Sequence, residues 1–223
     1  MDRVDRFGRW GWRFGLLGLA VLMSFGCGPS ALWHIWKGEQ LKDPDHPLTP
    51  PKGKKEIVVA VSVTPTPGIA PGVDLDLASK IGSQMKAISE ANEGHPIKLI
   101  ESSKVNALRT NDPDQWARGN PAMFAKKLGA DYWIDVTLHN FTLTDRDSAG
   151  EICRGRATLD VSVFKAGEAM PVSQYPLVSE APLRPNDVSQ MSIYRNQYIG
   201  TLATQVAFKH VKYKKPQEDA LLK

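Results

Sequence analysis

The sequence contains few cysteines and only a short apolar run near its start. Its 2 cysteines among 223 residues are Cys27 and Cys153, too few for the disulfide framework that holds many small secreted domains together. The apolar run that follows from Phe14 reaches Cys27 well short of the ~20 residues that a membrane-spanning helix needs. We therefore expect neither a disulfide-based fold nor a spanning helix here.

Neither sign of charge dominates the chain. It has 28 Lys and Arg against 24 Asp and Glu, a formal net charge of +4, and residues 1–26 carry four of the arginines and two of the aspartates. This balance lacks the basic surface typical of nucleic-acid-binding proteins, so we expect no nucleic-acid partner. The basic residues from Lys209 to Lys215 are most simply a solvated helix end, where cations suit the helix dipole.

Metal-binding and catalytic motifs are also missing. The five histidines, His34, His46, His95, His139 and His210, have no metal-ligand spacing with one another or with Cys153. The loop "GIAPGVD" follows a predicted strand but is not closed by the Gly-Lys-Ser/Thr of a phosphate loop, and no serine lies in a Gly-x-Ser-x-Gly setting. We therefore expect no metal and no cofactor.

One catalytic alternative remains open at the sequence level. Glu151, Cys153 and Arg154 could surround a thiol nucleophile, but a lone cysteine at the start of a strand is more often a small buried hydrophobe. We expect no enzymatic activity; a cleft that brought Cys153 beside His139 would reverse this expectation.

The N-terminus has the order of residues typical of a secretory signal. Four arginines (Arg3, Arg6, Arg9 and Arg13) precede the apolar run. The small residues before Cys27 resemble the lipobox of bacterial lipoproteins, whose cysteine is diacylated after the signal is cut, although Ser24 stands where that motif normally has Leu. We expect a signal peptide over residues 1–26 and a lipid on Cys27. The alternatives are an ordinary signal peptide cut elsewhere and an uncleaved short anchor.

Three further segments follow the signal. Residues 27–55 contain five prolines and predict a lipid-anchored tether, in which Trp33 and Trp36 either rest among lipid headgroups or pack onto the folded domain. A domain is expected over 56–215 and a polar tail over 216–223.

The apolar patterns predict alternating strands and helices over this domain. The expected elements are a strand at 57–63, a helix capped by Asp74, a strand from Ile97, a helix from Pro121 to Gly129, a strand from Tyr132 with a bulge near His139, a strand over 157–163, an edge strand containing Pro176, and a helix over 188–213. The order is β-α-β-α-β-β-β-α. We expect an α/β (α+β) fold with a mixed sheet and helices mainly on one face.

Three stretches carry a family resemblance: "IKLIESSKVNALRTND", "MFAKKLGADYWIDVTL" and "ATLDVSVFKAGEAMPVSQYP". They resemble the domain shared by the LpoB activators of penicillin-binding proteins, the curli-secretion lipoprotein CsgG, the polysaccharide-export lipoprotein PelC and the N-terminal domain of TolB. The resemblance spans about Ile57 to Tyr213. It implies either activation of a cell-wall synthase or participation in a secretion or export assembly, and it implies no catalytic residue.

The final helix predicts a contact surface. On a helical wheel, Ile193, Ala207, Phe208 and Val211 lie opposite the core-facing stripe. An isolated domain would expose this row, which is then either plain surface, a seat for the tether, or a contact with a partner or a second copy. The candidate partner-binding residues are therefore Ile193, Phe208, Val211 and Lys212.

Together these features predict a membrane-anchored lipoprotein of the bacterial cell envelope that faces the periplasm. We expect a non-catalytic binding or assembly factor for cell-wall synthesis or envelope export, whose partner is a cell-wall synthase or an export component. The alternative is a homo-oligomeric structural subunit of a secretion or export complex. Gly28, rather than Asp, follows Cys27, which in enterobacterial lipoproteins favours the outer membrane.

Overall fold

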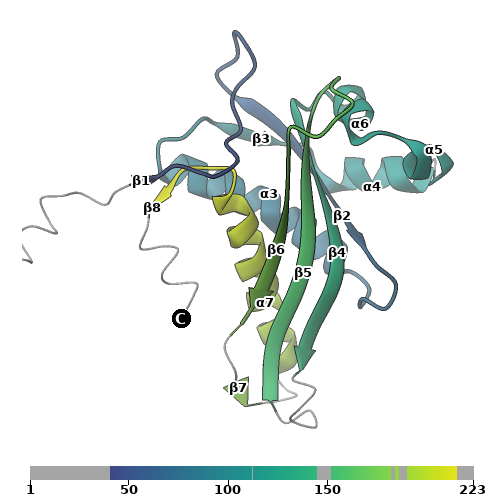
Figure 1. The fold of residues 1–223 in the computed structure, drawn as a ribbon, viewed down its shortest axis with the longest axis vertical. Coiled ribbons are helices and arrows are strands. Elements are labelled where there is room, and N and C mark those ends of the chain that lie inside the picture. Colours follow the sequence, from purple (N-terminus) through teal and green to yellow (C-terminus); the bar gives the residue numbers. More distant parts are fainter. Residues whose placement is uncertain (1–40, 112, 145–151, 182–183, 186–189, 215–223) are drawn as a thin grey trace, which may run out of the picture. The chain divides into compact units, whose positions relative to one another are not determined.

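The domain is built on a mixed β-sheet (Figure 1). The computed structural model describes residues 41–111, 113–144, 152–181, 184–185 and 190–214. The strands are β1 (Leu41–Lys42), β2 (Ile57–Pro65), β3 (Ile97–Leu99), β4 (Tyr132–Thr144), β5 (Ile152–Lys165), β6 (Ser173–Glu180), β7 (Arg184–Pro185) and β8 (Tyr213–Lys214). The helices are α3 (Val73–Ala91), α4 (Ser102–Asn111), α5 (Pro113–Arg118), α6 (Pro121–Leu128) and α7 (Met191–Phe208).

The sheet has the strand order β3-β2-β4-β5-β6, and β7 pairs with β5. Strands β3, β2 and β4 are parallel, whereas β4, β5 and β6 are antiparallel. Parallel neighbours need long crossover connections, and helices supply them here, while the antiparallel strands follow one another directly. The predicted α/β class with a mixed sheet is confirmed. A separate small ribbon joins β1 to β8.

Helices cover the two faces of the sheet unequally. The long helices α3 and α7 lie side by side behind the sheet in Figure 1 and pack on the apolar residues of one face, such as Val59, Ile134 and Leu159. On the other face, the short helices α4 to α6 cover a smaller cluster around Ala60 and Trp133. The rest of that face is lined by polar and partly exposed side chains of β4, β5 and β6. The long helices thus lie on one face, as the sequence predicted.

Strand β4 contains the predicted bulge. Its register with β5 shifts between Leu138 and Asn140, so that Leu138 stays fully buried while His139 lies on the exposed side. Strand β6 ends the strand order. Pro176, which has no N–H for a further ladder, therefore lies on an edge strand, as predicted.

Two predicted boundaries differ from the structure. The N-cap of α3 is Gly72, with φ at 81°, not Asp74, whose carboxylate instead pairs with Arg109 from the first turn. The strand expected from Ile97 ends at Leu99 because α4 begins at Ser102. By contrast, α6 ends at Gly129 in a left-handed cap (φ 72°), as expected.

Gly155 leaves room for the aromatic ring of Tyr198 where β5 crosses α7. A Cβ atom on Gly155 would lie only 2.8 Å from ring atoms of Tyr198, and the Gly155 N–H donates to the Tyr194 hydroxyl at 2.7 Å. We expect Gly155→Ala to lower the free energy of unfolding by about 1 to 3 kcal/mol, because the ring or the strand must shift. The measurement is the urea midpoint.

Gly200→Ala is the matched control for this prediction. A Cβ atom on Gly200 meets no described atom within 4 Å, and alanine in a helix interior is favoured over glycine by about 0.5 to 1 kcal/mol. The control variant should therefore be at least as stable as the wild type. Equal urea midpoints for the two variants would contradict the packing described for Gly155.

Candidate functional site

The structure places Cys153 and His139 apart, whereas Glu151, the third residue considered for catalysis near Cys153, lies outside the described residues. His139 Nε2 lies 2.7 Å from Asp160 Oδ2 on the exposed side of the sheet. Cys153 is one of the alternate residues of β5 that are buried. Its partner in β4 is Thr144, which lies five residues beyond His139 along that strand. The structure therefore does not bring Cys153 beside His139. No group of three or more His, Cys, Asp or Glu residues among 41–111, 113–144, 152–181, 184–185 and 190–214 is placed to hold a metal ion.

Helices that could cross a membrane are absent from the described ranges, since none is both long and apolar enough. The predicted lipid site, Cys27, and the tryptophans Trp33 and Trp36 lie outside the described residues. The first described residues after Cys27 are those of β1.

Residues 41–55, which we call the strap, pack onto the domain instead of forming a tether. Strand β1 pairs with β8, and the backbone N–H of His46 donates to the Lys209 carbonyl at 2.8 Å. Leu48 is buried in the main core. The tether prediction is therefore corrected for this segment: the compact unit begins at Leu41, because Leu48 and the two backbone contacts fix the strap to the end of α7.

Ion pairs also connect the strap to the residues that follow α7. Lys212 Nζ lies 2.9 Å from Asp43 Oδ1, and Lys209 pairs with Asp45. Both pairs are largely exposed, so each contributes little stability by itself. The Lys209 ammonium nevertheless lowers the pKa of the Asp45 carboxyl through a hydrogen bond and its charge. At the other end of the strap, Lys54 Nζ reaches Asp131 Oδ1 at 2.7 Å.

A buried polar cluster lies beneath the strap. His210 Nε2 is 2.8 Å from the Tyr175 hydroxyl, and His210 Nδ1 is 3.0 Å from the His46 carbonyl oxygen. A carbonyl only accepts, so Nδ1 carries the proton, and the neutral ring accepts from Tyr175 at Nε2. Burial lowers the pKa of His210 to about 4 and raises the pKa of Tyr175. The His210 ring and the Tyr175 hydroxyl are therefore both neutral at physiological pH.

A cavity of about 430 Å³ lies between the strap and the ends of α3 and α7. Its lining residues are Asp43, Pro44, Pro47, Leu48, Thr49, Ile57, Ser89, Glu93, Gly94, His95, Ile97, His210, Val211 and Lys212. The volume falls in the range of small-molecule sites. The lining combines an apolar part with charges of both signs, and so it specifies no ligand class.

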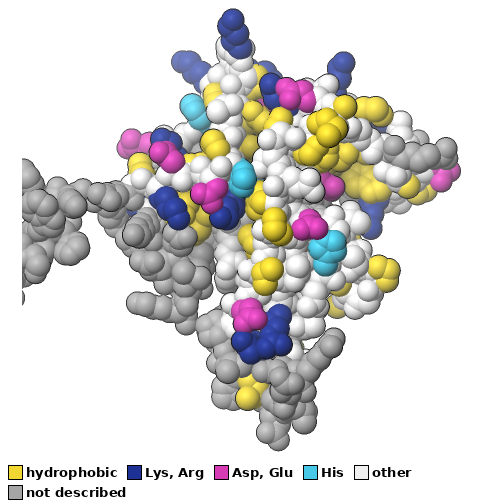
Figure 2. All heavy atoms as spheres, in the orientation of Figure 1, with side chains coloured by type: hydrophobic (Ala, Val, Ile, Leu, Met, Phe, Trp, Pro, Cys, Tyr) yellow, Lys and Arg dark blue, Asp and Glu magenta, His cyan; other side chains and the backbone are white. Residues whose placement is uncertain are grey.

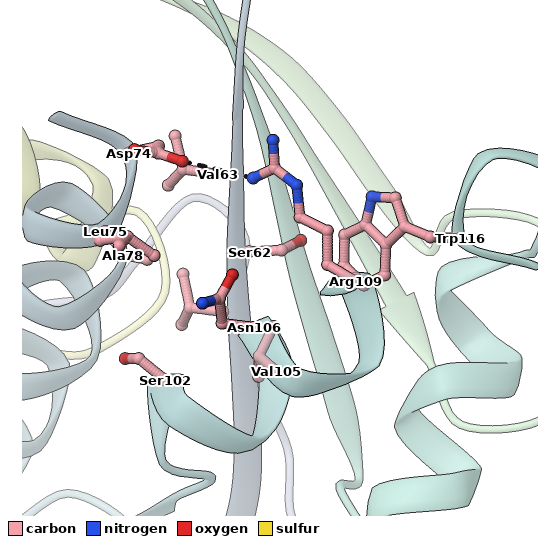
Figure 3. A pocket seen from close by; sticks show the side chains of 11 residues that line it. Ser62, Val63, Asp74, Leu75, Ala78, Ser102, Val105, Asn106, Arg109 and Trp116 are labelled. Carbon is pink, nitrogen blue, oxygen red and sulfur yellow. Dashed lines mark hydrogen bonds and ion pairs between the residues drawn. The ribbon is translucent and has the colours of Figure 1, made fainter. Parts of the chain in front are cut away.

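A much smaller pocket, shown in Figure 3, lies between β2 and the helices α3 to α5. Arg109 Nη1 crosses it to Asp74 Oδ2 at 3.3 Å. Beside it, Ser62 Oγ accepts from Trp133 Nε1 at 2.8 Å and donates to Asp135 Oδ1 at 2.6 Å. Burial raises the pKa of Asp135. The pocket's volume of about 20 Å³ is close to the space of one water molecule and far below the volume of small-molecule sites.

The surface predicted on the final helix is not an exposed row. Phe208 and Val211 are buried in the main core, at 7% and 6% exposure, whereas Ile193 is 55% exposed. The wheel assumed a helix to residue 213, but α7 ends at Phe208, and Tyr213 of β8 stacks on the Phe208 ring at 4.0 Å. Lys212 is exposed and pairs with Asp43. The expectation that Phe208 and Val211 are exposed is therefore wrong, because β8 folds back on the end of α7.

No protein-family model and no curated protein matches the chain. Similar solved structures include a PelC dodecamer from Paraburkholderia phytofirmans, at 11% identity over 76% of this chain and 96% of that chain, with a TM-score of 0.45. A lipoprotein from Neisseria meningitidis has 9% identity over 67% and 99% of the two chains, with a TM-score of 0.39. A minor lipoprotein from Acinetobacter baumannii has 12% identity over 69% and 87%, with a TM-score of 0.33. The structural neighbours thus include bacterial lipoproteins, while the finer resemblance to the LpoB, CsgG and TolB domains stays a prediction.

Proposed function

We propose that this chain is a lipoprotein of the bacterial cell envelope that acts by binding rather than by catalysis. A lipid on Cys27, exposed after removal of residues 1–26, holds it on a membrane, with the outer membrane favoured. The domain faces the periplasm and binds a protein that builds the cell wall or exports envelope material. The arginine-rich start, the short apolar run and the lipobox-like residues support the anchor.

The observation that carries the proposal is that the strap is already packed on the domain from Leu41 onward. Residues 28–40 alone separate Cys27 from Leu41, where β1 is already paired to β8. Thirteen residues, fully extended, span at most about 45 Å. An anchor at Cys27 would therefore keep the domain next to the membrane surface, at a high effective concentration toward membrane-bound partners.

The partner face in this proposal is the part of the sheet that α4 to α6 leave uncovered. Figure 2 views this side and displays mixed charged, polar and apolar side chains over β4, β5 and β6. Val178 of β6 is 73% exposed, and the His139–Asp160 pair lies on the same side. A mixed surface of this kind suits a non-obligate protein contact, which is about as apolar as the rest of a protein surface.

A photo-crosslinking amino acid at position 178 of the full chain tests the binding role in cells. We expect an adduct with an envelope protein of cell-wall synthesis or export. The same probe at Leu75, which is exposed on α3 beside the small pocket of Figure 3 and not on the uncovered sheet face, should give far less adduct. An adduct of twice the chain mass would instead select the homo-oligomeric subunit. Equal crosslinking at both positions would contradict a partner on the sheet face.

A further inference from the structure

Exposed apolar side chains gather at the end of the domain where β5 turns into β6. Met170 and Val172 of this turn are 76% and 48% exposed, and Met123 of α6 is 54% exposed. Hydrogen bonds hold the turn against the first turn of α6. The Asn120 Nδ2 donates to the Ala169 carbonyl at 2.7 Å, and the Gly167 N–H donates to the Ala122 carbonyl at 3.5 Å. These bonds place the three apolar side chains on adjoining turns at one end of the domain.

Lysines border these apolar side chains. Lys126 and Lys127 follow Met123 by three and four positions in α6 and therefore share its face of the helix. The opposite face of α6 is buried, with Phe124 packed against Trp133. Both lysines are exposed. Figure 2 shows apolar side chains over α6 and dark blue Lys and Arg side chains at the same end of the molecule.

The neighbouring carboxylates are already engaged by other lysines. Glu168 pairs with Lys165 at 2.8 Å, and Asp131 pairs with Lys54 at 2.7 Å. No described residue forms an ion pair with Lys126 or Lys127, although Lys127 Nζ lies 3.5 Å from Gln115 Oε1. The patch of Met123, Lys126, Lys127, Met170 and Val172 is therefore apolar at its centre and positively charged at its border.

We infer that this patch rests on the anionic surface of the membrane that carries the lipid anchor. The inference rests on the proposed function, because an anchor at Cys27 makes that membrane the nearest large anionic surface. Lysines are attracted to anionic headgroups, and exposed Met and Val gain by entering the headgroup boundary. The patch is too small to hold the protein by itself. It sets which side of the domain faces the lipid and which side is left for a partner.

An environment-sensitive fluorescent amino acid at position 170 of the full chain tests this inference. The chain is reconstituted in phosphatidylcholine vesicles with or without phosphatidylglycerol. We expect a blue shift of the emission in the anionic vesicles only, since there the probe leaves water. The same probe at position 178, on the uncovered sheet face, should not shift. Lys126→Gln with Lys127→Gln should lower the ratio of membrane-contacting to free orientations about thirtyfold, and high salt should act in the same direction.

Three results would overturn the inference. These are equal emission in the two kinds of vesicle, a shift that survives the double lysine substitution, and a shift in neutral vesicles that grows with protein density, which would indicate a second copy of the chain. Emission is compared only for chain that co-floats with each kind of vesicle, so a missing shift counts against the patch and not against the anchor. Failure of the lipid anchor is measured separately, by labelling.

Discussion

Phe208→Asp is expected to unfold the domain or to lower its free energy of unfolding by about 3 to 5 kcal/mol. Phe208 is 7% exposed at the end of α7, and its ring stacks on Tyr213. Aspartate at this position would lose the apolar contacts and place an unpaired charge among buried side chains. Urea denaturation followed by circular dichroism measures the effect.

Ile193→Asp provides the matched control, because Ile193 lies on the same helix but is 55% exposed. A charge there stays in water, and the change should be within about 0.5 kcal/mol of the wild type. If instead Phe208→Asp is as stable as Ile193→Asp, then the end of α7 is open to solvent and the description of β8 and the strap is wrong.

The second large effect is a loss of stability between pH 6.5 and about 4. The pKa of His210 is lowered by burial from 6.5 to about 4 in the folded chain. Above pH 6.5 both the folded and unfolded states hold a neutral imidazole, so His210 has no pH-dependent effect. As the pH falls, the unfolded state binds a proton first, and stability decreases until the folded state is protonated as well. The shift corresponds to about 3 kcal/mol.

The difference between wild type and His210→Gln isolates this contribution, since Asp135 and the other carboxylates titrate in both proteins. Asp135 acts in the opposite direction, because its raised pKa favours proton uptake by the folded state. We expect the urea midpoint of the wild type to fall more steeply below pH 6.5 than that of the variant. Parallel pH profiles would mean that His210 is not held neutral beneath the strap.

Much of the sheet could be predicted from local patterns. The alternation in β5 fixes which side chains enter the core, and the change of phase after Leu138 reveals the bulge at His139. The cap at Gly129 follows from a single residue that tolerates the left-handed conformation. Such features depend on neighbours in the sequence, and for this reason the sequence alone predicts them.

The strap could not be predicted in the same way. Its apolar contact with the core comes from Leu48, a single residue among prolines and charges that has no periodic pattern around it. Its partners on α7 and beyond are distant in sequence: His210 and His46 are 164 positions apart. The same holds for the cavity beneath it, whose lining is drawn from several separate segments.

The predicted contact surface on the final helix is wrong for a related reason. The wheel misplaced Val211 because it continued the helix past Lys209, and it misplaced Phe208, the last residue of α7, because a wheel cannot show that β8 covers this turn. In the structure the His210 N–H donates to the Ala207 carbonyl at 2.9 Å, and the chain turns there into β8. A helical wheel carries no information about where a helix stops, and no glycine or proline stands between Phe208 and Tyr213 to mark the end.

Metabolic labelling with a clickable palmitate analogue tests the lipid anchor, the central claim, most directly. The full chain and its Cys27→Ala variant are expressed in a bacterial host and purified under denaturing conditions. We expect label in the wild type and none in Cys27→Ala, while Cys153→Ala, which removes a buried side chain, should keep the label. Equal labelling of wild type and Cys27→Ala, or no label in either, would contradict the account.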